Sequence, residues 1–391
     1  MEIITELCTG CKACADICPK DAISFVSDDE GFHIPEINNE QCIDCKLCQK
    51  HCPQNADSHQ PTLQKVYAFT AKDKALLKKS ASGGAFAVFA KAILEKGGVV
   101  VGCAYDNDLR AKHILVENVS DLQKLQGSKY VQSDTAGIYK IVKERLLNGQ
   151  PVLFSGTGCQ IGALKSYLRK DYENLITVDI ICHGVPSPLL FEKYKEYLTL
   201  KYKSSVKTYD FRNKDRNGWG LEAKIATDND KHYVTGWQDP YYLYFLKGAT
   251  YRESCYQCRY NNTNRHSDIT VGDYWGLMKH HPDFYDQRGV SVIVINSQKG
   301  FDFYNSCNDS FIDIETAFED AASGNLNLLE PTPKTPNRTH IYEGITSLDV
   351  CAFFKENFPI SKKQLLKAEI ISWFPVSLKM NIKKFLYNIK R

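Results

Sequence analysis

Two cysteine runs near the N-terminus constrain this chain more than any other feature. Both have the spacing C-x2-C-x2-C-x3-C-P, the first over residues 8–19 and the second over 42–53. In such a run a tight loop lets the first three thiolates converge on one [4Fe–4S] cluster, while the fourth ligates the other cluster. The spacing therefore predicts two clusters, one held by Cys8, Cys11, Cys14 and Cys52 and the other by Cys42, Cys45, Cys48 and Cys18.

A pair of structural zinc sites is the alternative interpretation of these runs. Zinc sites also use C-x2-C, but they take cysteines in pairs. Each run here has three closely spaced cysteines followed by a fourth, which fits a zinc site poorly. The runs resemble the bacterial-type two-cluster ferredoxin domain, which passes single electrons. About 55 residues bury little apolar surface, so the clusters are expected to hold this domain together. We therefore predict an α+β, ferredoxin-like two-cluster head over residues 1–57.

Composition and charge limit the class of protein. Hydrophobic residues make up 43% and charged residues 24% of the chain, which excludes a disordered or fibrous protein. The start has neither the basic nor the apolar region of a signal peptide, so fifteen cysteines indicate redox or metal chemistry in the cytoplasm. The net charge is +3 and is distributed unevenly: residues 1–60 carry −7, residues 361–391 carry +7, and the residues between them carry +3. The acidic head predicts a basic redox partner protein, and the overall balance argues against nucleic-acid binding.

Strand-like and helix-like stretches alternate over residues 65–330 and predict a mixed α/β domain. Strands are expected over 66–70, 98–105, 152–154, 175–181, 269–271 and 290–295, and helices over 84–96, 134–148, 160–170 and 187–200. Residues 331–391 form a predicted C-terminal extension. Its last part places Leu378, Ile382, Phe385, Leu386 and Ile389 at helical spacing among lysines. Such a basic amphipathic helix could lie on the inner face of a membrane or pack on its own domain.

Four cysteines of the large domain predict a further metal site. Cys159 and Cys182 each follow a predicted strand, and Cys255 and Cys258 form a C-x2-C pair. Loops after parallel strands meet at one edge of the sheet, so these four thiols could hold a third [4Fe–4S] cluster. A zinc ion at the pair plus two buried thiols fits the spacing equally well. Cys103, Cys307 and Cys351 are expected to be core thiols.

Six stretches of residues 65–330 together resemble the beta subunit of coenzyme F420 hydrogenase/dehydrogenase. They are Lys79–Gly84, Gly127–Ser133, Ser155–Gln160, Cys182–Gly184, Cys255–Cys258 and Ser267–Gly276. The resemblance implies an iron–sulfur flavoprotein with FAD between the clusters and a two-electron substrate, and it favours the third cluster. One departure is Gly158, where archaeal members often carry proline. The family also includes 7-hydroxymethyl chlorophyll a reductase, so the resemblance does not fix the substrate.

Three loops and one carboxylate are the candidate flavin site. Two loops of small residues precede helices, where backbone amides favour an anionic pyrophosphate; ordinary helix caps and turns are the alternative. In the third, Lys129 could meet a phosphate or a reduced flavin, Tyr130 could stack on its ring, and Gln132 could bond its edge. Asp273 could orient an arginine or a cofactor hydroxyl, or equally make a purely structural hydrogen bond, and His183 is expected to be structural or a proton relay. The full set is Ser80, Ser82, Gly83, Gly84, Lys129, Tyr130, Gln132, Ser155, Gly156, Thr157 and Asp273.

These features predict an FAD-dependent iron–sulfur oxidoreductase. It would pass electrons between a redox partner, [4Fe–4S] clusters and FAD to a two-electron substrate, either coenzyme F420-like or another small metabolite. The alternatives are a reductase in polysaccharide biosynthesis, a non-catalytic electron-transfer subunit of a larger complex, and a zinc-stabilised scaffold. The sequence identifies no catalytic residue.

Overall fold

The computed structural model describes residues 7–55 and 64–373. An eight-stranded mixed sheet forms the centre of the large domain, in the order β13-β3-β12-β11-β7-β6-β4-β5. Its strands are β3 (Lys65–Ala71), β4 (Val99–Tyr105), β5 (Ala111–Val116), β6 (Val152–Thr157), β7 (Leu175–Ile180), β11 (Ile269–Asp273), β12 (Ser291–Ile295) and β13 (Phe311–Glu315). The central strands β4, β6, β7 and β11 run parallel, and the flanking strands pair antiparallel.

Helices cover both faces of this sheet, which explains the near-continuous apolar runs in its central strands. Val100 and Leu153 pack toward α4 (Ala85–Glu95) and α10 (Gln298–Asn305). Val101 and Phe154 pack toward α5 (Ile138–Leu147) and α6 (Gly158–Leu168) on the other face. The short helices are α3 (Lys74–Lys79), α9 (Leu277–His280) and α11 (Phe318–Ser323).

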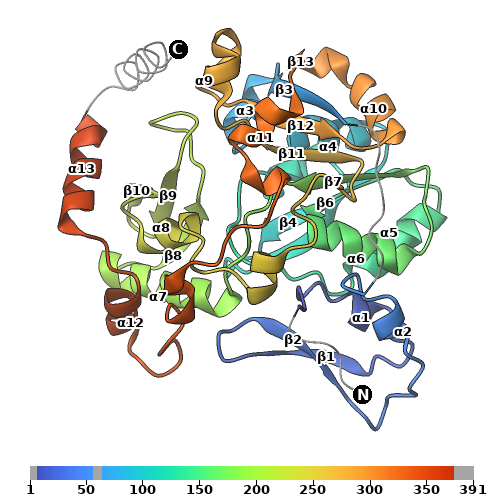
Figure 1. Cartoon of the computed structure of the whole chain (residues 1–391), viewed down its shortest axis with the longest axis horizontal. Coiled ribbons are helices and arrows are strands. Elements are labelled where there is room, and N and C mark those ends of the chain that lie inside the picture. The colour runs from blue at the N-terminus through green and yellow to red at the C-terminus, as the bar shows by residue number, and fades with distance from the viewer. Residues whose placement is uncertain (1–6, 56–63, 374–391) are drawn as a thin grey trace.

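A smaller unit of the large domain has its own aromatic core. It consists of the antiparallel strands β8 (Val206–Asp210), β9 (Glu222–Thr227) and β10 (Lys231–Thr235) with α7 (Pro188–Tyr202), α8 (Pro240–Leu246) and α12 (Val350–Asn357). Phe353 and Phe354 of α12 pack against Tyr194 in this core. The expected C-terminal extension therefore supplies core side chains up to Phe358, and α13 (Lys362–Trp373) follows at the edge of the molecule (Figure 1).

The head lies beneath α5 and α6 (Figure 1). It contains the hairpin β1 (Ile23–Ser27) and β2 (His33–Ile37) and the single-turn helices α1 (Ala13–Asp16) and α2 (Leu47–Lys50). Its buried apolar side chains are few: Ala13, Ala22, Ile23 and Phe32. The ferredoxin-like head and the mixed α/β domain are thus confirmed at the level of architecture.

All six predicted strands and four predicted helices of the large domain are present. The prediction missed β5, β8, β9, β10 and β13. Within the described ranges, no helix is long and apolar enough to cross a bilayer. The predicted amphipathic helix around Leu378–Ile389 lies outside those ranges.

Candidate functional site

A cavity of about 500 Å³ lies at the carboxyl ends of β4, β6, β7 and β11. Its lining residues come from these strands and the loops after β6, β7 and β11, from the smaller unit and from the head. Ligand pockets in proteins range over about 300–1,000 Å³ and often lie at such sheet edges. This cavity is lined by ten of the eleven predicted flavin-site residues and by five of the twelve predicted cluster cysteines.

The four candidate cysteines of the large domain all line this cavity. Cys159 opens α6, Cys182 follows β7, and Cys255 and Cys258 belong to the turn that includes Glu253–Gln257. Burial raises the pKa of Cys159 to about 12, and the nearby thiols of Cys258 and Cys255 add to the rise. Burial also raises the pKa of Cys182, with contributions from the other three thiols. Four mutually close, buried thiolates are stable only around a cationic group.

No three His, Cys, Asp or Glu side chains within residues 7–55 and 64–373 converge tightly enough for a single metal ion. None of the fifteen cysteines, all of which lie in the described ranges, forms a disulfide. All four large-domain cysteines are therefore available as ligands of a metal site.

The head presents one predicted cluster site to this cavity. Cys11 lines the cavity, and burial raises its pKa to about 12, with Cys8 and Cys159 adding to the rise. Burial likewise raises the pKa of Cys14, and the thiols of Cys11, Cys8 and Cys52 contribute. The structure thus brings together the inner cysteine set, defined as Cys8, Cys11, Cys14 and Cys52.

The second predicted site lies on the side of the head away from the cavity. Cys18, Cys42, Cys45 and Cys48, the outer cysteine set, line one small depression. Burial raises the pKa of Cys48, and Cys45 and Cys18 contribute. Cys45 is exposed to solvent, whereas Cys11 is enclosed between the head and the large domain. Cys52 thus lies near the first run and Cys18 near the second, the arrangement that the predicted exchange of fourth ligands requires.

Side chains of the large domain hold the first cysteine run by its backbone carbonyls. Arg252 Nε and Ser254 Oγ donate to Cys8 O at 2.6 and 3.0 Å. Thr135 Oγ1 and Tyr139 Oη donate to Cys11 O at 2.7 and 3.0 Å. Side chains of the large domain therefore hold the loop that carries the inner set through its backbone, and these hydrogen bonds do not depend on which side chains the loop carries.

The second run is held in the same way. Ser166 Oγ donates to His51 O at 2.6 Å, and Tyr260 Oη donates to Pro53 O at 3.2 Å. Tyr260 is buried, and its ring packs against Gly162, where a Cβ would lie 2.5 Å from the Tyr260 hydroxyl. Tyr260 thus lies between Cys258 and the second run of the head.

Three head carboxylates also face the large domain. Asp16 accepts from the backbone N–H groups of Gly137 and Tyr139 at 2.9 and 3.2 Å. Asp21 pairs with Lys140 at 3.2 Å, and Glu30 forms a two-pronged pair with the buried Arg338. Part of the negative charge of the head therefore serves docking within the chain.

The loop before α4 contributes Ser80, Ser82 and Gly84 to the cavity. Gly84 caps the helix with φ +86°, a conformation that favours glycine. Gly83 does not line the cavity, because it packs against β3, where a Cβ would meet Phe69 O at 2.3 Å. Lys214 Nζ donates to Ser82 O at 2.6 Å and fixes the loop. Gly83 is thus a packing position rather than a contact position.

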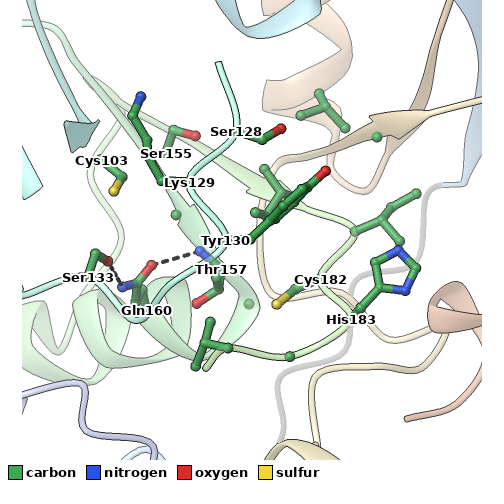
Figure 2. A pocket seen from close by; sticks show the side chains of 18 of the residues that line it. Cys103, Ser128, Lys129, Tyr130, Ser133, Ser155, Thr157, Gln160, Cys182 and His183 are labelled. Carbon is green, nitrogen blue, oxygen red and sulfur yellow. Dashed lines mark hydrogen bonds between the residues drawn. The ribbon is translucent and has the colours of Figure 1, made fainter. Parts of the chain in front are cut away.

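The second loop, Ser155 to Thr157, ends β6 and starts α6 with a capping box between Thr157 and Gln160. Gln160 Nε2 donates to Ser133 Oγ at 2.9 Å, and Ser133 Oγ lies 3.1 Å from His113 Nδ1 (Figure 2). His113 Nε2 lies 3.2 Å from the Ser155 carbonyl, which assigns the proton to Nε2. Burial lowers the pKa of His113 to about 4, so this ring is neutral at pH 7.

The third loop lines the cavity, but two of its polar groups are directed elsewhere. Lys129 Nζ donates to the carbonyls of Gln126 and Gly127 at 2.8 and 3.2 Å. Gln132 Nε2 donates to Thr9 O of the head at 3.0 Å. Tyr130 stacks on Phe245 with centroids 4.2 Å apart. Lys129 and Gln132 therefore stabilise the walls of the cavity in this conformation.

Asp273 orients an arginine, one of the roles predicted for it. Its two oxygens accept from Arg212 Nη1 and Nη2 at 2.6 and 2.8 Å, and Trp219 Nε1 also donates to Asp273. Arg212 is 4% exposed, donates to Gly220 O, and lies over the ring of Trp275. Burial alone would lower the pKa of Arg212, but Asp273 more than offsets this and raises it above its usual range.

Two of the remaining predictions, those for Cys103 and Cys351, change. Cys103, expected in the core, lines the cavity from β4, where its partner on the neighbouring strand β5 is His113. Cys351 is exposed, since it lies on the outer face of α12, whereas Cys307 is buried as expected. His183 lines the cavity, and burial lowers its pKa. His113 and Arg212 were missed, because each is a single residue in a strand or turn without a motif.

Comparisons with known proteins cover most of the chain. Residues 66–140 and 149–319 match the models for the N- and C-terminal parts of the coenzyme F420 hydrogenase/dehydrogenase beta subunit, together more than half of the chain. Residues 7–56 match a 4Fe-4S dicluster domain. A chain of the F420-reducing [NiFe] hydrogenase complex from Methanosarcina barkeri aligns with TM-score 0.45 and 17% identity over 76% of this chain and 92% of that one. No curated protein matches this chain.

Proposed function

We propose, on the premise that this chain belongs to the coenzyme F420 hydrogenase/dehydrogenase beta subunit family, that it is an FAD-dependent iron–sulfur oxidoreductase with three [4Fe–4S] clusters. Iron–sulfur electron transfer follows from the family and from the dicluster domain. The flavin, the third cluster and the substrate class are the proposed parts. The observation that carries the proposal is that one cavity gathers the flavin loops, the large-domain cysteines and Cys11 of the inner set.

The three cysteine sets form a continuous order from the surface inward. The outer set includes the exposed Cys45, and Cys18 and Cys52 connect it to the inner set by exchanging ligands between the two runs. Cys11 of the inner set is close enough to Cys159 for each thiol to affect the other. Electron transfer requires short gaps between centres, and this order keeps each centre next to the following one.

The cavity walls suit a flavin nucleotide. Two helices, α4 and α6, begin at its edge, and their N-terminal N–H groups suit a pyrophosphate. Tyr130, Phe245 and Leu246 provide an apolar wall for a ring system. A bound flavin exchanges electrons singly or in pairs, and so connects one-electron clusters to a two-electron substrate. His113 is neutral and Arg212 is paired with Asp273, so neither places an uncompensated charge in this cavity.

A second candidate function is a relay subunit that only passes electrons within a complex. The cavity favours an enzyme, because a relay needs no space beside its clusters for a small molecule. We expect the isolated chain to reduce or oxidise a small two-electron compound with an artificial one-electron reagent. A protein that exchanges electrons only with another protein would be a relay.

Metal and flavin content of anaerobically purified protein tests the proposal. We expect about twelve iron atoms and one FAD per chain. The double variant Cys255→Ser/Cys258→Ser should lower the iron content to about eight, while Cys307→Ser, a matched buried thiol, should leave it at twelve. About eight iron atoms in the unmodified protein would contradict the proposed third cluster, and absence of FAD would contradict the proposed flavin.

A further inference from the structure

The outer cysteine set reaches the surface of the head. Cys45 is the exposed member of the twelve candidate cluster ligands, all of which lie in the described part of the chain. Ile43, between the ligands Cys42 and Cys45, is 57% exposed. The inner set and the large-domain cysteines are enclosed by the contacts between the head and the large domain. Among the described residues, the face around Ile43 therefore offers a protein partner its closest approach to a candidate cluster ligand.

Local charge on this face differs from the net charge of the head. Lys20 and Lys46 are the charged residues that line the depression of the outer set, and both are exposed. Asp44 is exposed in the same loop but does not line the depression. Asp16 accepts from the backbone of the large domain, and Asp21, which follows Lys20 in sequence, is paired with Lys140 of α5. Both charged side chains that line the depression are thus positive.

We infer that the face formed by Pro19, Lys20, Ile43, Cys45 and Lys46 is the docking surface for a small, acidic, one-electron carrier protein. This deepens the proposed function and rests on it only for the outer cluster. Electron-transfer encounters use small interfaces, often below about 1,200 Å², with an apolar centre and a polar rim. Ile43 supplies the centre and the two lysines supply the rim. Each encounter moves one electron between the carrier and the protein, with no bond broken and no proton transferred.

This inference replaces the basic partner expected from the net charge of the head. Electrostatic steering depends on the charges around the docking patch, because salt at physiological strength screens more distant charges beyond about 8 Å. Lysines at the cluster edge attract an acidic carrier there. A basic carrier would be steered toward carboxylates elsewhere on the head, away from the exposed ligand.

The test is electron transfer to two protein acceptors of opposite charge. The purified protein is reduced anaerobically, freed of reductant and mixed rapidly with rubredoxin, a small acidic iron protein, or with cytochrome c, a basic haem protein. We expect the rate with rubredoxin to fall as salt is raised. We expect Lys20→Glu/Lys46→Glu and Ile43→Glu each to slow rubredoxin reduction roughly tenfold or more, within the range seen for mutants of one interface.

Matched variants and small reagents separate docking from loss of the cluster. Val26→Glu replaces an apolar side chain that is 38% exposed on the hairpin of the head, and Lys74→Glu reverses an exposed lysine on the large domain. Both should leave the rubredoxin rate unchanged. Iron content and reduction by methyl viologen should be unchanged in every variant. A protein without iron would remove the proposed function, whereas full iron content with unaltered rubredoxin rates would overturn only the docking surface.

The salt dependence of the unmodified protein keeps the inference testable if a variant loses iron. A rubredoxin rate that rises with salt, or cytochrome c reduction that is faster and is slowed by Lys20→Glu, would overturn it.

Discussion

The buried pair between Asp273 and Arg212 offers a sharp test of how the cavity is built. Asp273→Asn keeps the size and shape of the side chain but removes its charge. The amide places N–H groups against a guanidinium that already donates to Gly220 O and lies over Trp275. Arg212 is 4% exposed, so water cannot replace the lost carboxylate.

The expected loss is large for a single substitution. Removing one partner of a buried pair leaves an uncompensated charge and costs about 3–5 kcal/mol. For a domain of this size that corresponds to a drop in Tm on the order of 10 °C. The exposed pair of Asp228 with Lys207 provides the matched control, because exposed pairs contribute little to stability and Asp228→Asn should leave Tm nearly unchanged.

Thermal unfolding followed by tryptophan fluorescence suits this comparison. Trp219 donates to Asp273, and its ring stacks on Trp275 with centroids 5.3 Å apart, so both report on the pair. The double variant Asp273→Asn/Arg212→Met removes the charge as well and should recover most of the loss. Equal losses for Asp273→Asn and Asp228→Asn, or a double variant no better than the single one, would refute the reasoning.

Three further predictions follow from buried groups and from the head. The pKa of His113 is about 4 in the folded protein against 6.5 for the free side chain, so protonation favours unfolding. The contribution of neutral His113 to the free energy of unfolding should be fully present above pH 6.5 and be lost, by on the order of 3 kcal/mol, as the pH drops toward 4. Urea unfolding of His113→Gln should lack this loss. An unchanged dependence of the free energy of unfolding on pH in that variant would contradict the prediction. Gly162→Ala should cost about 1–3 kcal/mol, because its Cβ would lie 2.5 Å from the Tyr260 hydroxyl; Gly162→Ala/Tyr260→Leu should recover part of this, whereas a fully tolerated Gly162→Ala would show that the ring moves freely. Removing iron with a chelator should abolish amide exchange protection in the head but not in β6, since the head buries only a few apolar side chains; a protected, iron-free head would mean that packing alone holds it.

The central sheet could be predicted because its strands are buried on both faces. The run Val152–Phe154 of β6, for example, is apolar without interruption, and the helical pattern of α6 follows directly. The small antiparallel sheet was missed because its strands mix charged and apolar residues, as in Glu222–Thr227 and Lys231–Thr235. Their stability comes from the aromatic core beneath them, which no local pattern reveals.

The site divides in a similar way. The cluster ligands could be predicted because the spacing of the cysteines in sequence is set by the loop that must surround a cluster. The orientation of Gln132 depends on the carbonyl of Thr9, which lies 123 positions away in sequence. Likewise Arg212 becomes part of the cavity only through Asp273, 61 positions away. Such long-range partners require the tertiary structure.

The contacts that hold the head to the large domain have a consequence for how such chains diversify. The large domain donates these hydrogen bonds to backbone carbonyls of the head, those of Cys8, Thr9, Cys11, His51 and Pro53. The docking therefore depends more on the course of the head's main chain than on the identity of its side chains. That path is dictated by wrapping around a cluster. A head with a different surface but the same cysteine spacing should seat equally well once assembled, provided that it keeps Asp16 and Glu30, which also bind the large domain. The electron carrier that a chain uses could thus be exchanged by replacing its first 55 residues, with the chemistry of the cavity left as it was.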